Sequence, residues 1–385
     1  YTPYQAEVAQ GRLEALLNYQ TVICDLTGME ISNASLLDEA TSAAEAMTML
    51  HGCRTRDQIK NEVNKFIVSD DIFDQTLAVL ETRAEPLGIE IVLSNTDSIE
   101  IDEKVFGCMV QYTGKTGKIN DLETLSKKIE KSNCKLIVAA DLMSLTVLKE
   151  PSAFNSDVVI GTSQRFGIPL GYGGPHAGYF ATKKEYKRFI PGRIIGVSKD
   201  RNGNRALRMA LQTREQHIKR ERATSNICTA QVLLAVMAGM YAVYHGKSGL
   251  IEIANKINRL ARILDDRLKS LNIEQINKIY FDTIHIKFPT NKLRELSETK
   301  KINFNYINEN ELSISINEAT EINDIEKICE IFESILSKKS NIKEIESINP
   351  SIPTIYVRKT SFLDEKVFNS YQSETSMMRY IKSLE

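Results

Sequence analysis

The sequence lacks an excess of charge of either sign, because 49 lysine and arginine residues nearly balance 50 aspartate and glutamate residues. No overall field is therefore expected to attract nucleic acid or an anionic membrane. The sequence also lacks a long apolar run. The longest, around 232–243, contains Gly239 and is too short to span a bilayer, so it predicts a buried helix.

Cysteine is scarce and scattered, with no CxxC pair and no histidine nearby at ligand spacing. This pattern argues against a structural zinc site or other metal site, and it indicates a reducing compartment. The chain begins at Tyr1 rather than at methionine, so it says nothing about a targeting peptide. Each cysteine is expected to be a small buried apolar residue: Cys24, Cys53, Cys108, Cys134, Cys228 and Cys329.

What is present is an alternation of apolar strand-like and helix-like segments. This pattern is typical of an α/β fold with a mostly parallel sheet covered on both faces. Strands are predicted at 66–69, 89–93, 105–111, 136–140, 158–161 and 178–181. Helices are predicted at 13–27 (closed by Gly28), 39–50 (capped by Asp38), 73–85, 122–131 and 225–244.

The pattern changes after His245 and Gly246, which predict a break before a second helix over 249–271. A smaller α/β unit follows, and then a polar, proline-containing linker from Ser337 to Thr360. The predicted domains are 1–246, 247–336 and 337–385. In the smaller unit, strands are predicted at 283–288 and 311–316, and helices at 291–298 and 322–336.

Five segments resemble the first half of the glycine decarboxylase P-protein family, in the same order. The longest is Gly161-Thr-Ser-Gln-Arg-Phe-Gly-Ile-Pro-Leu-Gly-Tyr-Gly-Gly-Pro-His176. The others are residues 1–11, 31–41, 211–220 and 223–231. The resemblance covers most of 1–246. It implies the aspartate aminotransferase fold of pyridoxal-phosphate enzymes, with a large domain and a smaller C-terminal α/β domain.

In that fold, an aspartate ending one strand pairs with the pyridinium nitrogen, and a lysine ending the next strand forms the Schiff base. Asp141 occupies the aspartate position, but Gln164 falls on the lysine. The family's phosphate-gripping segment falls on 40–45, which has lost both glycines. The resemblance implies that this half has no catalytic residue and holds no cofactor. One alternative is that Asp141 merely caps a loop. A separate alternative is that Lys183 or Lys184 is a displaced Schiff-base lysine.

By resemblance, the family's active site lies at an interface, so this half is expected to contribute side chains in trans. Phe73, at a position where relatives stack an aromatic ring on the cofactor, is expected to be core, and spacing places Tyr19 on the outer side of its helix. The basic run 183–188 predicts a solvated helix face. His51, His245 and His285 are expected at the surface or as caps. The candidates in trans, each with a packing, capping or ion-pairing alternative, are Tyr1, Tyr4, Arg214, His217, Ser225 and Asn226.

The resemblance implies a protein that decarboxylates glycine with pyridoxal phosphate, held by the missing second half, and passes the aminomethyl group to the lipoyl arm of the H-protein. The implied partners are the lipoylated H-protein, the catalytic half, other glycine cleavage components and a second copy of the full chain.

A bacterial cytoplasmic location is expected, with the mitochondrial matrix as the alternative. Residues 362–381 resemble the start of the second half, which indicates the fused form. Two rivals remain: a scaffold-only pseudoenzyme subunit, and an independent pyridoxal-phosphate transaminase or decarboxylase.

Overall fold

A computed structural model describes residues 8–211, 216–223, 230–340 and 352–385. The chain forms two compact units. The first comprises Tyr1–Tyr112, Asp121–Leu250 and Arg358–Glu385, and the second comprises Thr113–Asn120 and Ile251–Val357. The predicted borders after 246 and 336 stay predictions. The compact units differ from them in assigning 113–120 to the second unit and 358–385 to the first.

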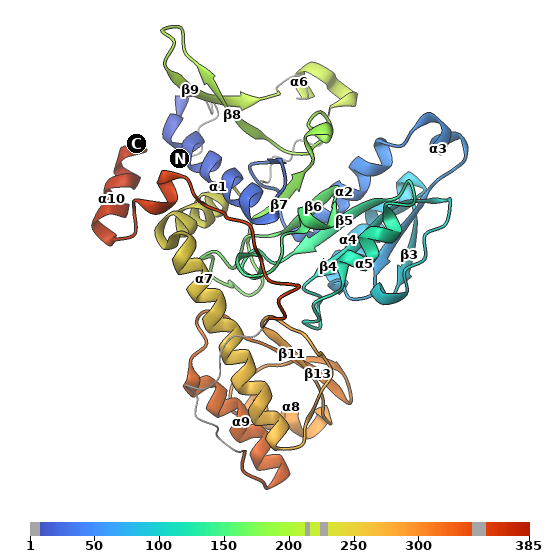
Figure 1. The fold of residues 1–385 in the computed structure, drawn as a ribbon, viewed down its shortest axis with the longest axis vertical. Coiled ribbons are helices and arrows are strands. Elements are labelled where there is room, and N and C mark those ends of the chain that lie inside the picture. The colour runs from blue at the N-terminus through green and yellow to red at the C-terminus, as the bar shows by residue number, and fades with distance from the viewer. Residues whose placement is uncertain (1–7, 212–215, 224–229, 341–351) are drawn as a thin grey trace. The chain divides into compact units, whose positions relative to one another are not determined.

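The first unit contains a seven-stranded sheet in the order β1-β7-β6-β5-β4-β2-β3 (Figure 1). The pairs β2–β3, β2–β4, β4–β5 and β5–β6 are parallel, whereas β7 is antiparallel to both β6 and β1. The α/β prediction with a mostly parallel sheet is confirmed. The strands are β1 Ile31–Ser32, β2 Lys65–Ser69, β3 Glu90–Ser94, β4 Val105–Tyr112, β5 Lys135–Ala140, β6 Val158–Thr162 and β7 Gly178–Thr182.

Helices pack on the sheet, and the central strands are buried along their length. Every residue of β4 is buried, as expected for a parallel strand covered on both faces. The predicted caps are present: Gly28 has a left-handed φ of 71°, and Asp38 Oδ1 accepts a 2.7 Å hydrogen bond from Thr41 N. The helices are α1 Gln10–Thr27, α2 Glu39–Gly52, α3 Arg56–Lys60, α4 Asp74–Ala84 and α5 Leu122–Ile129.

Helix α1 is covered on more than one side, and the prediction for Tyr19 was therefore wrong. Tyr19 is fully buried rather than on an outer face. The sheet contacts α1 through β1 and β7, while α10 (Glu374–Ser383) contacts it from another side. Asn18 Nδ2 donates a 2.7 Å hydrogen bond to Tyr380 OH on α10. The Tyr19 hydroxyl lies 3.5 Å from Ser163 Oγ and from Gly178 O, and spacing within α1 does not reveal contacts with segments so far along the chain.

The apolar run 232–243 lies in α7 (Val232–Ser270), whose helical backbone is interrupted at Gly246 as predicted (φ 61°). The helix before the break is only partly buried, so the prediction of a buried helix was half wrong. Leu233, Met237 and Tyr244 are 68%, 37% and 40% exposed. At helical spacing these three side chains form an apolar stripe. The small residues between them, Ala235, Ala238 and Ala242, face the core.

A β-hairpin that the sequence did not predict follows β7 in the first unit. It consists of β8 (Ile194–Lys199) and β9 (Arg205–Ala210), paired antiparallel as a separate two-stranded sheet. An Asn-Gly pair, Asn202-Gly203, lies in its turn, and this is the residue pattern that could have identified it. The basic run 183–188 forms a short 3-10 turn, Lys184–Tyr186, and not a helix face.

The second unit has a four-stranded antiparallel sheet in the order β10-β11-β13-β12, and its described residues also form α8, α9 and the end of α7. His285 is buried and bonds Glu311 Oε2 through Nε2 at 3.1 Å, so the expectation of a surface or capping residue was wrong. The elements are β10 Glu274–Gln275, β11 Thr283–Lys287, β12 Asn305–Asn308, β13 Glu311–Ser315, α8 Thr290–Thr299 and α9 Ile322–Leu336.

Candidate functional site

The carboxyl ends of β5 and β6 bring together the residues that the sequence singled out. Asp141 follows β5, and its Oδ1 accepts a hydrogen bond from Met143 N at 3.2 Å. Its Oδ2 accepts from Ser144 N at 3.2 Å and lies 3.0 Å from Arg165 Nη1. Two backbone donors and one guanidinium therefore engage the Asp141 side chain. Arg165 is the partner that the sequence did not reveal.

Gln164 follows β6 and directly precedes Arg165 in the sequence. Its side chain is partly buried. Its backbone N–H bonds Thr162 Oγ1 at 3.2 Å, and its amide Nε2 donates to Leu170 O at 3.4 Å. The same threonine hydroxyl lies 2.7 Å from His176 Nδ1. Burial lowers the pKa of His176, which favours its neutral ring. The glutamine amide thus faces its own loop.

The first turn of α2 overlaps residues 40–45, on which the family's phosphate-gripping segment falls without its glycines. Asp38 caps its N–H groups, and the backbone carbonyl of Asp38 accepts the Ser42 hydroxyl at 2.7 Å. Burial raises the pKa of Glu39 to about 7. A hydrogen bond from Gln111 lowers the pKa, and the charges of Asp141 and Asp38 raise it. Glu39 Oε1 is buried without a hydrogen-bond partner. A helix N-terminus attracts anions, but here carboxyl groups of the chain itself surround it.

These residues do not fit pyridoxal phosphate, the cofactor that the resemblance implies. A pyridinium nitrogen would need Asp141, which Arg165 already neutralises at 3.0 Å. A phosphate would meet the carboxylate of Asp38, which already occupies the N–H of Thr41. A neutral amide at position 164 cannot form an imine.

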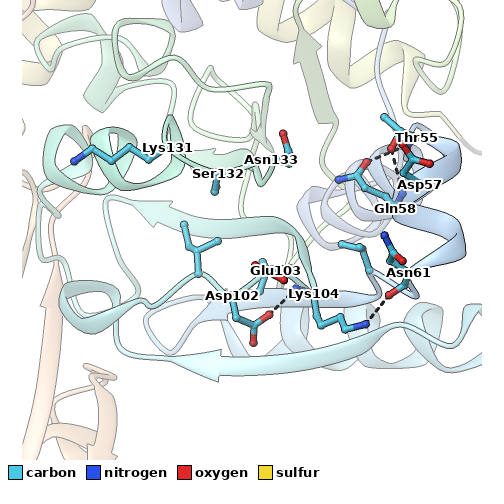
Figure 2. Close-up of a pocket in the computed structure, with 13 residues that line it drawn as sticks. Thr55, Asp57, Gln58, Asn61, Asp102, Glu103, Lys104, Lys131, Ser132 and Asn133 are labelled. Carbon is cyan, nitrogen blue, oxygen red and sulfur yellow. Dashed lines mark hydrogen bonds between the residues drawn. The ribbon is translucent and has the colours of Figure 1, made fainter.

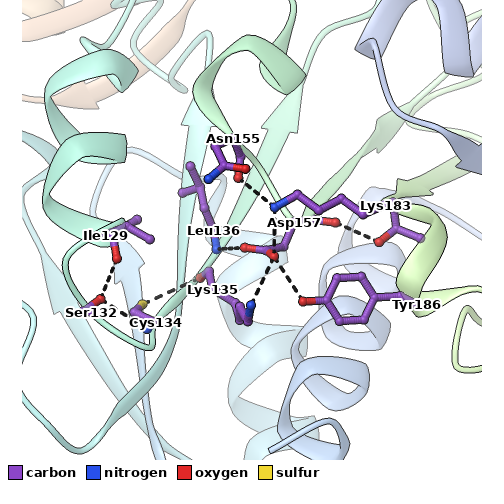
Figure 3. Close-up of polar contacts among 10 residues, drawn as sticks. Ile129, Ser132, Cys134, Lys135, Leu136, Asn155, Asp157, Lys183 and Tyr186 are labelled. Atoms are coloured by element: carbon purple, nitrogen blue, oxygen red, sulfur yellow. Dashed lines mark hydrogen bonds and ion pairs between the residues drawn. The ribbon is translucent and has the colours of Figure 1, made fainter.

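Lys183, the alternative lysine, lies at the other end of the sheet. Its Nζ is 3.2 Å from Asp157 Oδ1 and 3.2 Å from Asn155 O (Figure 3). Asp157 immediately precedes β6, and Lys183 immediately follows the antiparallel β7, so both lie where β6 begins. Gln164 lies beyond the point where β6 ends. This geometry gives Lys183 a structural partner away from the candidate site.

A polar cavity of about 780 Å³ also lies at the amino ends of the parallel strands (Figure 2). Lys104 and Val105 line it at the start of β4, and Ser132 and Asn133 line it just before β5. Lys104 Nζ is engaged there, donating to Asn61 O at 2.6 Å. Ligands of open α/β sheets bind at the carboxyl ends of strands, so this cavity is separate from the site at Asp141.

The sequence model of the family described as "Glycine cleavage system P-protein" matches residues 1–332. The chain belongs to this family. It is 57% identical over its whole length to glycine dehydrogenase (decarboxylating) of Christiangramia forsetii, and 54% identical to that of Flavobacterium johnsoniae. It spans 41% of the length of each of these two relatives.

A solved glycine decarboxylase (P-protein) of the glycine cleavage system, in inhibitor-bound form, has the same fold as this P-protein chain. The TM-score is 0.78 at 31% identity, covering 87% of this chain and 78% of that one. A NifS-like protein is similar in fold alone, with a TM-score of 0.58 at 15% identity over 85% of this chain and 87% of that one. The aminotransferase-like fold is therefore confirmed for this family member.

The P-protein residues expected to act in trans lie outside the described residues. This holds for Tyr1, Tyr4, Arg214, Ser225 and Asn226, and for the side chain of His217, whose backbone is in the short helix α6 (Gln216–Lys219).

Phe73 and the cysteines differ in how far they are buried. Phe73 is 37% exposed at the start of α4, so its assignment to the core was wrong. Of the cysteines, Cys108, Cys134 and Cys329 are buried, and Cys24 and Cys53 are partly buried. Cys228 lies outside the described residues. In the described ranges, no helix is long and apolar enough to cross a membrane, and no three His, Cys, Asp or Glu residues are placed to hold a metal.

Proposed function

We propose that this chain is the non-catalytic half of a glycine decarboxylase that needs pyridoxal phosphate held by its other half. By the family resemblance, the intact protein decarboxylates glycine and transfers the aminomethyl group to the lipoyl arm of the H-protein. The cofactor supplies the electron sink for decarboxylation. The chain spans 41% of the length of its relatives, which leaves room in them for a second half.

The ion pair between Asp141 and Arg165 carries the proposal. A cofactor-binding half needs an aspartate that is free to meet a pyridinium nitrogen, and here a guanidinium neutralises the carboxylate at 3.0 Å. Gln164 and the capped start of α2 agree with this. The independent transaminase alternative would need all three features to be different.

The intact protein provides the test. Borohydride reduction followed by peptide mapping should place every pyridoxyl-lysine outside residues 1–385. A pyridoxyl-lysine between Asp141 and Phe189 would contradict the proposal. Glycine decarboxylation by the chain 1–385 alone would contradict it as well.

The contribution of this half to glycine binding is proposed for Tyr1 and Tyr4, because the corresponding family segment faces the partner's cofactor. A phenol there can hydrogen-bond a substrate carboxylate, and losing one such bond costs about 0.5–1.5 kcal/mol. Tyr4→Phe in the intact protein should slow glycine turnover roughly threefold to tenfold with unchanged cofactor content. Tyr306→Phe, which removes a hydroxyl bonded to Ser297 in the second unit, is the matched control. Wild-type turnover in both Tyr1→Phe and Tyr4→Phe would favour the scaffold-only reading.

For its remaining partners, we propose that the catalytic half covers the apolar stripe of Leu233, Met237 and Tyr244. Three exposed apolar side chains on one helix face fit an obligate interface. Sedimentation of the chain 1–385 alone should show self-association, whereas clean monomers would count against the proposal.

A dimer of the full chain and a bacterial cytoplasmic location complete the proposal. The bacterial origin of the relatives supports that location.

A further inference from the structure

The chain is nearly neutral as a whole but strongly basic in one segment. Between residues 183 and 222 it has thirteen lysine and arginine residues against four aspartate and glutamate residues. The hairpin of β8 and β9, with the residue before it, contributes five of these cations. All five are exposed, and within the described part of the chain none is ion-paired: Arg193, Lys199, Arg201, Arg205 and Arg208. We call these five residues the basic hairpin cluster.

The single carboxylate of the hairpin does not neutralise the cluster, because the turn uses it. Asp200 Oδ1 accepts hydrogen bonds from Asn202 N and Asn204 N, both at 2.8 Å, and Oδ2 accepts from Asn204 Nδ2 at 3.2 Å. The backbone hydrogen bond from Asn204 is the main reason that the pKa of Asp200 is lowered. Asp200 therefore stays ionised and holds the turn in place.

The strand pairing places like charges opposite each other. Lys199 on β8 is the direct cross-strand neighbour of Arg205 on β9, an arrangement that destabilises a hairpin. On the same face, Val197 is 61% exposed. Two facing cations beside an exposed valine do not stabilise the isolated chain. They form a positively charged surface with one exposed apolar side chain beside it, which suits a protein contact.

The hairpin is held firmly to the body of the first unit. The side-chain amide of Gln20 accepts from Ile195 N at 2.8 Å and donates to Ile195 O at 3.1 Å. Gln10 does the same with Leu207, at 2.8 and 2.9 Å. Both glutamines lie on α1, and Figure 1 shows the turn beyond these anchors extending away from the large sheet. A surface fixed in this way loses little entropy when a partner binds.

We propose that the basic hairpin cluster docks an acidic face of the lipoyl-bearing carrier protein. This inference rests on the proposed function for the existence of that carrier, and it adds where the carrier binds. Charge complementarity selects an acidic partner, and exposed Val197 favours a protein over a nucleic acid. The near-zero net charge of the chain agrees, since it provides no long-range attraction for a polyanion.

The test uses the intact decarboxylase, with its own lipoylated carrier protein as the probe. Arg205→Glu should raise the KM for the carrier roughly threefold to tenfold at low salt, with kcat at saturating carrier unchanged. The wild-type KM should rise with ionic strength, and the variant's KM should rise less. Because Arg205→Glu places an acidic side chain opposite Lys199, it should not lower the melting temperature. Arg205→Lys should restore the wild-type KM, and Lys60→Glu, at an exposed position on α3, is the charge-matched control.

The outcomes separate the two proposals. No carrier-dependent turnover by the wild-type protein would refute the proposed function. Normal wild-type turnover with an unchanged KM in Arg205→Glu would overturn the docking surface alone. An equal rise in KM for Lys60→Glu would also overturn it, because the effect would then belong to net charge. Salt-sensitive binding of a DNA duplex that Arg205→Glu abolishes, with carrier kinetics unchanged, would show a nucleic-acid contact instead.

Discussion

The guanidinium of Arg358 donates a 2.6 Å hydrogen bond from Nη2 to the backbone carbonyl of Asp25, in the last turn of α1. Its Nη1 donates to Leu26 O at 2.7 Å and to Leu145 O at 2.9 Å. Asp25 in turn accepts a 2.7 Å bond from the backbone of Leu363. Carbonyls at a helix end need partners from elsewhere, and here residue 358 supplies them. The C-terminal segment is thus part of the first unit.

Replacing this arginine should loosen α1. In Arg358→Met, three carbonyls would lose a charged donor, at a cost on the order of 3 kcal/mol. Hydrogen exchange in the last turn of α1 should speed up by roughly a hundredfold if this turn opens on its own. Lys359→Met, at the exposed neighbouring position, is the control and should exchange like the wild type. Equal exchange rates in both variants would show that Arg358 does not hold the helix.

Restoring a lysine alone should not restore a cofactor site. In Gln164→Lys, Asp141 would remain paired with Arg165, and Asp38 would still cap α2. The variant chain should therefore show no absorbance from bound cofactor after it has been exposed to pyridoxal phosphate and the free cofactor has been removed by dialysis. Adding Arg165→Thr and Asp38→Gly should increase cofactor retention. A specific borohydride-reducible adduct at position 164 in the single variant would contradict this account.

Glu39 should make stability depend on pH. Burial is the main reason that its pKa is about 7 in the fold, which lies above the ordinary glutamate value in the unfolded chain. The folded chain then binds more protons, so this contribution is fully present below about pH 4.5 and is lost as pH rises to about 7. The loss is at most about 3 kcal/mol, reduced because Glu39 is partly exposed.

The Glu39→Gln variant should remove this dependence. Urea midpoints measured at pH 5 and pH 8 should fall less with pH for this variant than for the wild type. Glu81→Gln, at an exposed position on α4, should keep the wild-type slope. The same slope for Glu39→Gln and the wild type would show that Glu39 does not titrate in this range.

Local patterns predicted the large sheet because each strand and cap is a short-range feature. Asp38, Gly28 and the break at Gly246 all lie where the sequence placed them. Contacts between distant segments were not predictable. Tyr19 is buried with its hydroxyl directed at Ser163 and Gly178, far along the chain, and the neutralisation of Asp141 depends on the direction in which Arg165 points. Both are properties of tertiary packing.

Asp157 is contacted by neighbours on β5 and just after β7, at one end of the large sheet. This buried carboxylate lies just before β6 and joins β5, β6 and the end of β7 (Figure 3). Its Oδ2 accepts from Leu136 N at 2.9 Å, and its Oδ1 accepts from Tyr186 OH at 3.1 Å. Lys183 and Lys135 Nζ lie 3.2 and 3.6 Å from Oδ1. The lysine side chains are 28% and 45% exposed, whereas the Leu136 backbone and the Tyr186 hydroxyl are buried.

Exposure decides which substitution costs most. Without Asp157, the lysines can turn to solvent, but the two buried donors cannot, and each orphaned donor costs about 1–3 kcal/mol. Asp157→Ala should therefore destabilise the chain by roughly 2–6 kcal/mol, and Asp157→Asn by less because one acceptor remains. Lys183→Met should cost under about 1 kcal/mol, as for a partly exposed ion pair. Urea unfolding of the three variants measures this order. If Lys183→Met were as costly as Asp157→Ala, the ion pair rather than the buried donors would hold this end of the sheet.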